Sequence, residues 1–487
     1  MRAAGVLLHI SSLPSEYSIG SLGKSAYEFV DFLEKSDQHV WQIMPICPTS
    51  YGDSPYQGVS AFAFNPYFID LDLLVEDGLL SKEELPEKRV CTRADYGDLF
   101  NNRFKILHKA FQRLDLVKTK FQKFVREQAF WLKDYAIYMV LKEDHNYASW
   151  DTWEDGFKFR NPEVLAKFEK ENKDRIKEWE FYQFLFYDQW MRLKKYAEKH
   201  NVQIMGDMPI YCAYDSVDVW SNPQDFQLDS NLKPYAVAGC PPDAFSADGQ
   251  LWGNPLYNWG KMRENGYTWW VERVKMALKV FHILRIDHFR GFAGYFSIPY
   301  GAPNAKGGHW EDGPRYSLFE KIKEACPNAN IVAENLGLLT PDVEELLNQC
   351  GYPGMNIFQF EWGDWNWNVP IYKGYPTNNV FYSGTHDNQM IASFYESLDE
   401  WHKQKVNQLT GIVWGDKPNL KIIEWCMKTP CDLCIIPLQD YLGLFDDEGR
   451  MNIPSKASGN WQYMAKKEDL SSWLSNYMKK ITKESGR

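Results

Sequence analysis

Eight short apolar runs recur along the chain, and segments with helical spacing separate most of them. Short apolar runs bounded by polar turns are typical of strands buried on both faces. Strands that alternate with helices favour a parallel sheet covered by helices, and eight such units predict an α/β fold, the (β/α)8 or TIM barrel. The predicted strands are Gly5 to Ile10, Val40 to Ile46, Val202 to Ile210, Phe281 to Asp287, Ile331 to Glu334, Met355 to Phe360, Val380 to Ser383 and Leu433 to Leu438.

Two long segments do not follow this alternation, so we expect residues 1–487 to form a single catalytic barrel with two insertions. From Leu71 to about Glu171 the chain has charged stretches of helical period and hardly any strand-like run, which predicts a largely helical insertion. Residues 211–259 are too long for a simple connector and predict a loop-rich insertion at the mouth of the barrel. The helices predicted for the barrel include Ser25 to Lys35, Thr268 to Val280, Tyr316 to Ala325, Pro341 to Gln349 and Asn419 to Met427.

The composition excludes several classes of protein. A net charge of −11 argues against a nucleic-acid partner, because such partners are held by basic patches. No apolar run reaches the roughly 18 residues of a membrane span, and the N-terminus does not resemble a signal peptide, so we expect no membrane association and a cytoplasmic location. The nine scattered cysteines predict reduced, mostly buried thiols.

Aromatic residues make up 16% of the chain, including 20 Trp and 28 Tyr. Tyr and Trp combine a flat apolar face with a hydrogen-bonding edge. Sugar rings have the complementary surface, with apolar C–H faces and hydroxyl rims. The aromatic content therefore hints at a carbohydrate ligand.

Three predicted strands end in a carboxylate: Asp287, Glu334 and Asp387. In a barrel these ends meet at one mouth, where such folds keep their catalytic groups. Arg285 lies two residues before Asp287, so both side chains point the same way and the guanidinium can keep Asp287 ionised. Taken alone, this pair fits an ordinary surface ion pair equally well.

Carboxylates that meet at one mouth divide into a protonated and an ionised group, which is the requirement of retaining glycosidase chemistry. Asp287 fits the nucleophile and Glu334 the acid/base, while Asp387 with His386 fits a grip on the sugar hydroxyls. The main alternative, metal-dependent hydrolysis, would need a histidine pair early in the barrel, yet His9 stands alone. We therefore expect no catalytic metal.

Several long motifs resemble those of the amylomaltases, or 4-α-glucanotransferases (disproportionating enzymes), relatives of the α-amylase clan. The resemblance covers nearly the whole chain. The motifs are YGDSPYQ at Tyr51 to Gln57, NPYFIDL at Asn65 to Leu71, GDMPIY at Gly206 to Tyr211, PPDAFSADGQLWGNPLYNW at Pro241 to Trp259, RIDHFRGF at Arg285 to Phe292, AENLG at Ala333 to Gly337 and GTHDNQ at Gly384 to Gln389.

This resemblance implies a (β/α)8 barrel with inserted subdomains, no metal or organic cofactor, and transfer of α-1,4-glucan segments to the 4-hydroxyl of an acceptor glucan. The partners it implies are maltooligosaccharides, amylose, starch or glycogen. Asp287, Glu334 and Asp387 match the family's nucleophile, acid/base and third acid. The residues expected to contact substrate, from the resemblance or from their place beside these motifs, are Tyr51, Ser54, Tyr56, Asp207, Trp252, Asn254, Arg285, His288, Asn335 and His386.

Three functions remain open at this point: a transferase, an α-glucan hydrolase and a catalytically silent glucan-binding protein. Transferase and hydrolase share a covalent glycosyl-enzyme and differ in whether a sugar hydroxyl or water reaches it. A transferase must exclude water, and the candidate covers are the aromatic loop from Gln250 to Trp259 and the pair Tyr51 and Tyr56.

Overall fold

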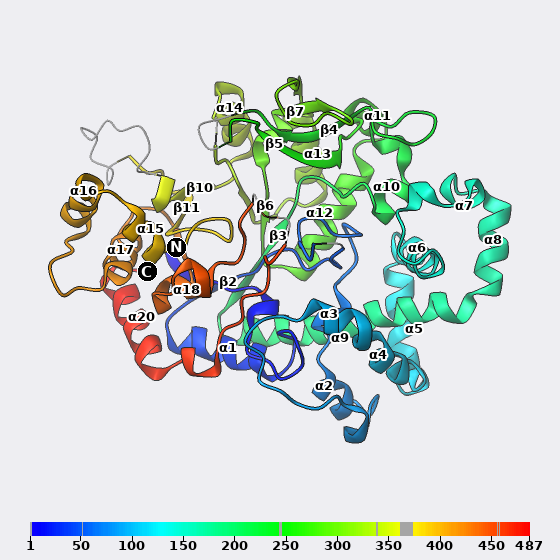
Figure 1. Ribbon diagram of the computed structural model, residues 1–487, viewed down its shortest axis with the longest axis horizontal. Helices are drawn as coiled ribbons and strands as arrows, with labels where there is room; N and C mark the ends of the chain where they lie inside the picture. The colour runs from blue at the N-terminus through cyan, green and yellow to red at the C-terminus, as the bar shows by residue number, and fades with distance from the viewer. Residues whose placement is uncertain are drawn as a thin grey trace.

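The computed structural model describes residues 2–50, 52–242, 246–337, 339–360, 374–454, 456 and 458–487. Its centre is one sheet of eight parallel strands in the order β10-β11-β12-β1-β2-β3-β6-β9 (Figure 1). Each strand overlaps one of the eight predicted runs. The strands are β1 (Ala3–Leu7), β2 (Val40–Gln42), β3 (Gln203–Met208), β6 (Ile283–Ile286), β9 (Ile331–Ala333), β10 (Gly354–Ile357), β11 (Asn379–Tyr382) and β12 (Leu433–Pro437).

The two ends of this sheet approach each other and nearly close it. The N–H of Ala333, at the end of β9, donates to the carbonyl of Pro353, just before β10, at 2.8 Å. The side-chain oxygen of Asn335 accepts a hydrogen bond from the N–H of Met355 in β10 at 2.7 Å. The predicted (β/α)8 barrel is confirmed.

The inside of the barrel is filled by a small apolar cluster to which every strand contributes. Because these apolar side chains fill the interior, the polar catalytic groups of such a barrel lie at the ends of the strands, as is usual for this fold. The buried members are Leu7, Val40, Met205, Ile283, Val332, Met355, Ile357, Val380, Tyr382 and Ile435.

The predicted barrel helices are confirmed to within one residue at each end. Each has an apolar face that packs on the barrel, such as Phe29, Val30 and Leu33 in the first of them. They are α1 (Lys24–Lys35), α12 (Thr268–Val280), α13 (Tyr316–Ala325), α14 (Pro341–Cys350) and α17 (Pro418–Met427); α20 (Ser472–Glu484) follows the last strand.

Residues 71–199 are all described, and they contain helices and no strand of either sheet. These helices occupy one side of the molecule in Figure 1. The long helix α9 packs against both α6 and the barrel helix α1, so it joins this region to the barrel. The helices are α2 (Leu71–Glu76), α3 (Tyr96–Asp98), α4 (Phe104–Phe111), α5 (Lys118–Glu127), α6 (Leu132–Asp144), α7 (Asp155–Lys158), α8 (Pro162–Glu171) and α9 (Lys173–Lys199).

A second, antiparallel sheet of order β5-β4-β7-β8 was not predicted (Figure 1). Its strands β4 (Ala236–Cys240) and β5 (Gln250–Pro255) lie in the segment predicted as loop-rich. Its strands β7 (Gly294–Pro299) and β8 (His309–Asp312) follow β6. These runs lack clear alternation. The pairs β4–β5 and β7–β8 are local, but β4 pairs with β7 far along the chain, so only the tertiary fold joins the two pairs into one sheet.

The structure also tests the predictions on membrane spans and on cysteines. Within the described residues, no helix is both long and apolar enough to cross a membrane. All nine cysteines are described and all are free thiols, but only Cys212, Cys426, Cys431 and Cys434 are buried, so the prediction of mostly buried thiols is only partly met.

Candidate active site

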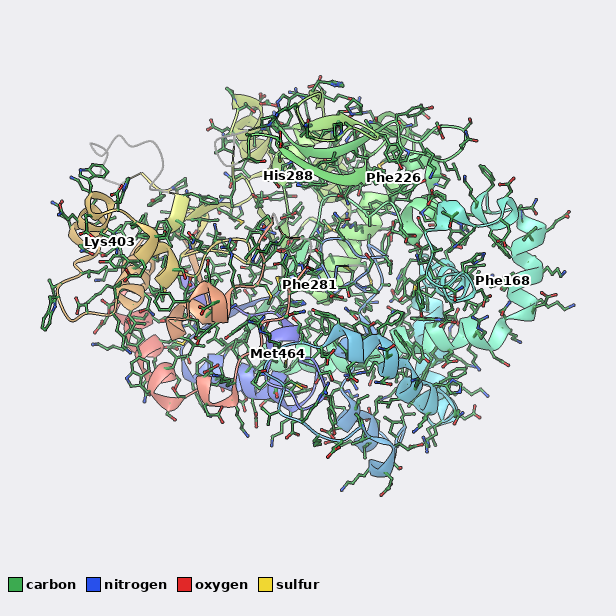
Figure 2. The ribbon with its side chains drawn as sticks, viewed as in Figure 1. Phe168, Phe226, Phe281, His288, Lys403 and Met464 are labelled. Atoms are coloured by element: carbon green, nitrogen blue, oxygen red, sulfur yellow. The ribbon has the colours of Figure 1, made fainter. Side chains whose placement is uncertain are left out.

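Asp287 lies where β6 releases the chain at the mouth of the barrel. Its N–H donates to the carbonyl of Met208, at the end of the neighbouring strand β3, at 3.0 Å. The next residue, His288, has a left-handed backbone (φ 47°, ψ 49°) and turns the chain into the short 3-10 helix η8 (Phe289–Phe292). Such a conformation is uncommon outside glycine and occurs often at functional sites. Figure 2 labels Phe281, which precedes β6, and His288, which follows Asp287.

Arg285 joins two carboxylates below the mouth. Its Nη1 donates to both oxygens of Asp207 at 2.7 and 2.6 Å and to Oδ1 of Asp287 at 3.0 Å. The side chains of Arg285 and Asp207 are 5% and 1% exposed. The two side chains of the Arg285–Asp287 pair therefore do point the same way. They belong to a three-member network in which Arg285 and Asp207 are buried and Asp287 is 26% exposed, rather than to a surface ion pair.

Glu334 follows β9, the strand beside β6, and its carboxylate reaches the backbone that follows Asp287. Its oxygens accept hydrogen bonds from the N–H of His288 at 2.5 Å and from the N–H of Leu336 at 3.2 Å. Its own N–H donates to the carbonyl of Ile286 at 3.0 Å. Asp287 and Glu334, far apart in sequence, thus share one end of the barrel.

The surroundings separate the protonation states of these two acids. Burial and the negative charge of Asp287 raise the pKa of Glu334 to about 8, although Arg285 and the two backbone N–H groups favour its ionised form. Burial raises the pKa of Asp287 to about 6, against the lowering effect of Arg285. At neutral pH Glu334 therefore carries the proton and Asp287 is ionised. Arg285 limits the rise in the pKa of Asp287 but does not reverse it.

Asp387 lies on a more open part of the mouth, after β11, with its side chain 47% exposed. Its Oδ1 accepts a hydrogen bond from Nδ2 of Asn452 at 2.6 Å and lies 3.4 Å from Nε2 of His386. Arg450 donates to its backbone carbonyl at 3.2 Å. Asn452 and Arg450 follow the last strand of the barrel. They could not be predicted as site residues, because their only signal in the sequence is polarity after a strand end.

Tyr56 connects the two parts of the mouth. Its hydroxyl donates to Oδ2 of Asp207 at 2.8 Å and lies 3.4 Å from Nδ1 of His386. The rings of Tyr56 and His386 stack, with centroids 4.8 Å apart and an interplanar angle of 16°. Trp461 lies 5.8 Å from Tyr56 and 5.9 Å from His386, and it was also missed from the sequence. These three rings form an aromatic cluster beside Asp387, in which His386 and Trp461 are buried and Tyr56 is partly exposed.

Three other predicted residues hold protein segments in place. Oγ of Ser54 accepts a hydrogen bond from the N–H of Tyr56 at 3.2 Å. Asn254 is buried and exchanges two amide hydrogen bonds with Gln57 (2.9 and 3.2 Å), and it also donates to the carbonyl of Cys212 at 2.9 Å. Both side-chain N–H groups of Asn254 are thus engaged, and its Oδ1 accepts one hydrogen bond and retains a second lone pair for a further donor. Oδ1 of Asn335 accepts the hydrogen bond from the N–H of Met355 in β10.

Trp252, on β5, covers the residue next to Asp287. Its ring centroid lies 4.9 Å from that of His288 in an edge-on arrangement, and its Nε1 donates to Gln250 at 3.0 Å. Burial and the charge of Arg290 lower the pKa of His288 to about 4, so its imidazole is neutral. The remaining predicted residue, Tyr51, lies outside the described residues.

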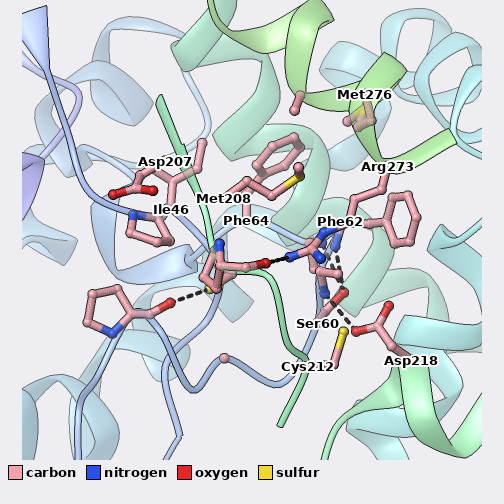
Figure 3. A pocket seen from close by; sticks show the side chains of 18 of the residues that line it. Ile46, Ser60, Phe62, Phe64, Asp207, Met208, Cys212, Asp218, Arg273 and Met276 are labelled. Atoms are coloured by element: carbon pink, nitrogen blue, oxygen red, sulfur yellow. Dashed lines mark hydrogen bonds between the residues drawn. The ribbon is translucent and has the colours of Figure 1, made fainter. Parts of the chain in front are cut away.

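Figure 3 shows a cavity of about 70 Å³ behind Asp207, lined mostly by apolar side chains such as Phe62, Phe64 and Met208. Arg273 crosses it to donate to the carbonyls of Pro209 and Ile210 at 2.6 and 3.2 Å. None of Asp287, Glu334 and Asp387 lines this cavity. It therefore belongs to the packing that supports β3 and is separate from the three acids.

Comparison with known proteins agrees with this geometry. A family model described as 4-alpha-glucanotransferase matches residues 8–469. The chain belongs to the 4-alpha-glucanotransferase family. The 4-alpha-glucanotransferase of Clostridium butyricum is 44% identical over 99% of this chain and 100% of its own length. That of Thermus thermophilus is 39% identical over 96% of each chain.

A solved structure gives the same result for the fold. The amylomaltase from Streptococcus agalactiae in complex with acarbose superposes with a TM-score of 0.96 at 39% identity, covering 100% of both chains. The family resemblance found in the sequence is confirmed, and the chain is an enzyme of the 4-alpha-glucanotransferase type.

Proposed function

We propose that this enzyme transfers α-1,4-glucan segments to the 4-hydroxyl of an acceptor glucan or glucose by a retaining double displacement through a covalent glycosyl-enzyme. Maltooligosaccharides, amylose, starch or glycogen would serve as donors. The observation that carries the proposal is the pair Asp287 and Glu334, which share one end of the barrel and differ in protonation state at neutral pH. Retaining chemistry requires this combination. The acarbose complex of the Streptococcus agalactiae relative supports a glucan-like ligand.

In the first half-reaction Glu334 would donate its proton to the glycosidic oxygen while a carboxylate oxygen of Asp287 attacks the anomeric carbon. The bond from that carbon to the glycosidic oxygen breaks, and the leaving chain departs with a 4-hydroxyl. Arg285 orients Asp287 for this role, because its Nη1 donates a hydrogen bond to Oδ1 of Asp287 at 3.0 Å.

In the second half-reaction Glu334 would accept the proton of the acceptor's 4-hydroxyl as that oxygen attacks the anomeric carbon and releases Asp287. Formation of the ester removes the negative charge of Asp287, which is one cause of the raised pKa of Glu334. The pKa of Glu334 then falls, so the same residue changes from acid to base at the right step.

The open part of the mouth would hold the reacting sugar. Asp387 and His386 offer acceptors and donors for ring hydroxyls, and the partly exposed ring of Tyr56, which packs on the buried rings of His386 and Trp461, offers an apolar face. Hydrogen bonds that strengthen as the ring flattens towards an oxocarbenium-like state stabilise the transition state rather than the substrate.

Transfer instead of hydrolysis requires that water be kept from the ester. Trp252 packs edge-on against His288, the residue beside Asp287, so β5 is the part of the structure best placed to cover the intermediate. Covering the site and positioning an acceptor both favour the sugar hydroxyl over water.

Incubation with maltotriose alone tests the proposal. A transferase yields glucose together with maltooligosaccharides longer than maltotriose, which chromatography resolves. New reducing ends without longer products would instead identify a hydrolase. An unchanged substrate would identify a glucan-binding protein.

A further inference from the structure

A second cavity, of about 420 Å³, lies on the side of the molecule where α15, α17, α18 and α20 come together (Figure 1). Helices α15 (Ile391–Ser397) and α18 (Leu438–Leu442) contribute to its wall. None of Asp287, Glu334 and Asp387 lines it, so it is separate from the catalytic centre. Its volume falls within the range of about 300–1,000 Å³ that is usual for small-molecule sites.

Two exposed aromatic side chains line this cavity from different elements. Phe445, which follows α18, is 49% exposed, and Trp473, in the first turn of α20, is 59% exposed. A single apolar side chain on a surface needs no explanation. Two large aromatic rings that line one cavity form a larger apolar surface, of the kind that marks binding sites.

The ring of Trp473 is held in position before any ligand arrives. The ring of Tyr477 lies parallel to it, with centroids 5.7 Å apart and an interplanar angle of 5°. The hydroxyl of Tyr477 donates to Glu424 at 3.1 Å, and Nζ of Lys417 lies 5.5 Å from the Trp473 ring. An aromatic ring fixed in this way loses little conformational freedom when a ligand stacks on it.

The rest of the lining is rich in hydrogen-bond acceptors. The carboxylates of Glu396, Asp416, Glu468 and Asp469 line the cavity, and Lys417 is the only Lys or Arg among the described residues that do so. Glu396 is paired with Lys403, labelled in Figure 2, at 2.9 Å, but a carboxylate keeps further lone pairs for other donors. This excess of acceptors disfavours an anion and leaves two kinds of ligand, a cation or a neutral molecule with many hydroxyl donors.

We propose that the cavity lined by Phe445 and Trp473 is a second binding site for α-glucan chains. Apolar sugar faces stack on the two rings, and the sugar hydroxyls donate to the surrounding carboxylates. The choice of α-glucan as ligand rests on the proposed function. A chain held there raises the local glucan concentration near the catalytic mouth, so the site serves long glucans and leaves the turnover of maltotriose unchanged.

Binding is tested in the Asp287→Asn background, where turnover does not consume the ligand. Electrophoresis in gels that contain amylose measures affinity through retardation of the protein. We expect Phe445→Ala with Trp473→Ala to lower that affinity about 3- to 10-fold. Trp473→Phe, which keeps an aromatic face, restores most of it. Trp414→Ala is the matched control, because Trp414 is fully exposed and lies outside the cavity.

Kinetics in the otherwise unaltered enzyme provide the second readout. The double variant keeps its maltotriose kcat/KM within about twofold but loses efficiency on amylose. Unchanged amylose retardation, or an equal loss in Trp414→Ala, would overturn the second site. Spermidine binding is measured as a probe for a cationic ligand. If the double variant lost spermidine binding but kept amylose binding, the cavity would be assigned to a cation and the proposed glucan site would be overturned. Failure of the proposed function is distinguishable, since it shows as missing chain lengthening in the unaltered enzyme.

Discussion

The mouth of the barrel has two sides that are built differently. At the ends of β3, β6 and β9, Asp207 and Arg285 are almost fully buried, and they hold Asp287 beside Glu334. After β11, by contrast, Asp387 is 47% exposed and is held mainly by the neutral amide of Asn452. The first side is thus a network of charged groups around the buried Arg285. The second side is a solvent-exposed carboxylate, Asp387, that one hydrogen bond from Asn452 keeps in place.

This difference separates the chemistry from the recognition. Burial gives the Asp287–Glu334 pair its opposite protonation states before substrate arrives, so that side is ready to react. Asp387 keeps access to water, so it gains strength as a hydrogen-bond acceptor only when a sugar displaces that water. The predictions below test this division, from the largest expected effect to the smallest.

Asp287→Asn removes the nucleophile and is expected to lower kcat by at least about 10³-fold. Glucan binding should change little, because the open side of the mouth stays intact. Single-turnover kinetics measure the first effect, and calorimetry with a maltooligosaccharide measures the second. Appreciable residual transfer would contradict the assigned role of Asp287.

Glu334→Gln removes the acid/base and is expected to lower kcat by about 10²- to 10⁴-fold. In the unaltered enzyme, kcat/KM should rise as Asp287 ionises with a pKa of about 6 and fall as Glu334 loses its proton with a pKa of about 8. The variant should lose the fall at alkaline pH. A profile in which that fall persists would show that another group supplies the proton.

The same variant reports on stability. The pKa of Glu334 lies above its ordinary value of 4.5, so the folded state binds this proton more tightly than the unfolded state does. The contribution of Glu334 to stability is therefore present below pH 4.5, declines as the pH rises towards 8, and levels off above that value. Glu334→Gln should raise Tm at pH 8 relative to the unaltered enzyme and change it little at pH 4, as measured by calorimetry.

Asn452→Ala tests the open side. Loss of its 2.6 Å hydrogen bond lets Asp387 leave its working position, and kcat/KM for maltotriose should fall about 10-fold. Asn452→Asp places a second carboxylate against Asp387 and should cost more than the alanine variant. If Asn452→Ala matched the effect of Asp287→Asn, the two sides would not divide chemistry from recognition as proposed.

Trp252→Ala is expected to have the smallest effect on overall rate but to raise hydrolysis relative to transfer. Its ring covers His288 beside the nucleophile, so its loss admits water to the ester. The ratio of glucose to longer products from maltotriose measures the change. Leu251→Ala is the control, because Leu251 is an exposed neighbour on the same strand. An unchanged ratio would show that Trp252 on β5 does not keep water from the ester.

Much of the fold was predictable because its signals are local. Each barrel strand is a short apolar run and each barrel helix an apolar stripe, so period and length identify both element types. The carboxylates Asp287, Glu334 and Asp387 follow strand ends, and the barrel then requires them to meet. The small antiparallel sheet had no such signal, because β4 and β7 depend on each other across a long stretch of chain.

By itself, the sequence determined the (β/α)8 barrel, the three acids at its mouth and the family to which the chain belongs. Only the tertiary structure gave the cause and the size of the pKa difference between Asp287 and Glu334, because a pKa depends on burial and on charges brought near by folding. It also decided that Asn452 and Trp461, more than 60 residues after Asp387, complete the open side. Local patterns encode elements, whereas contacts between distant elements exist only once the chain has packed.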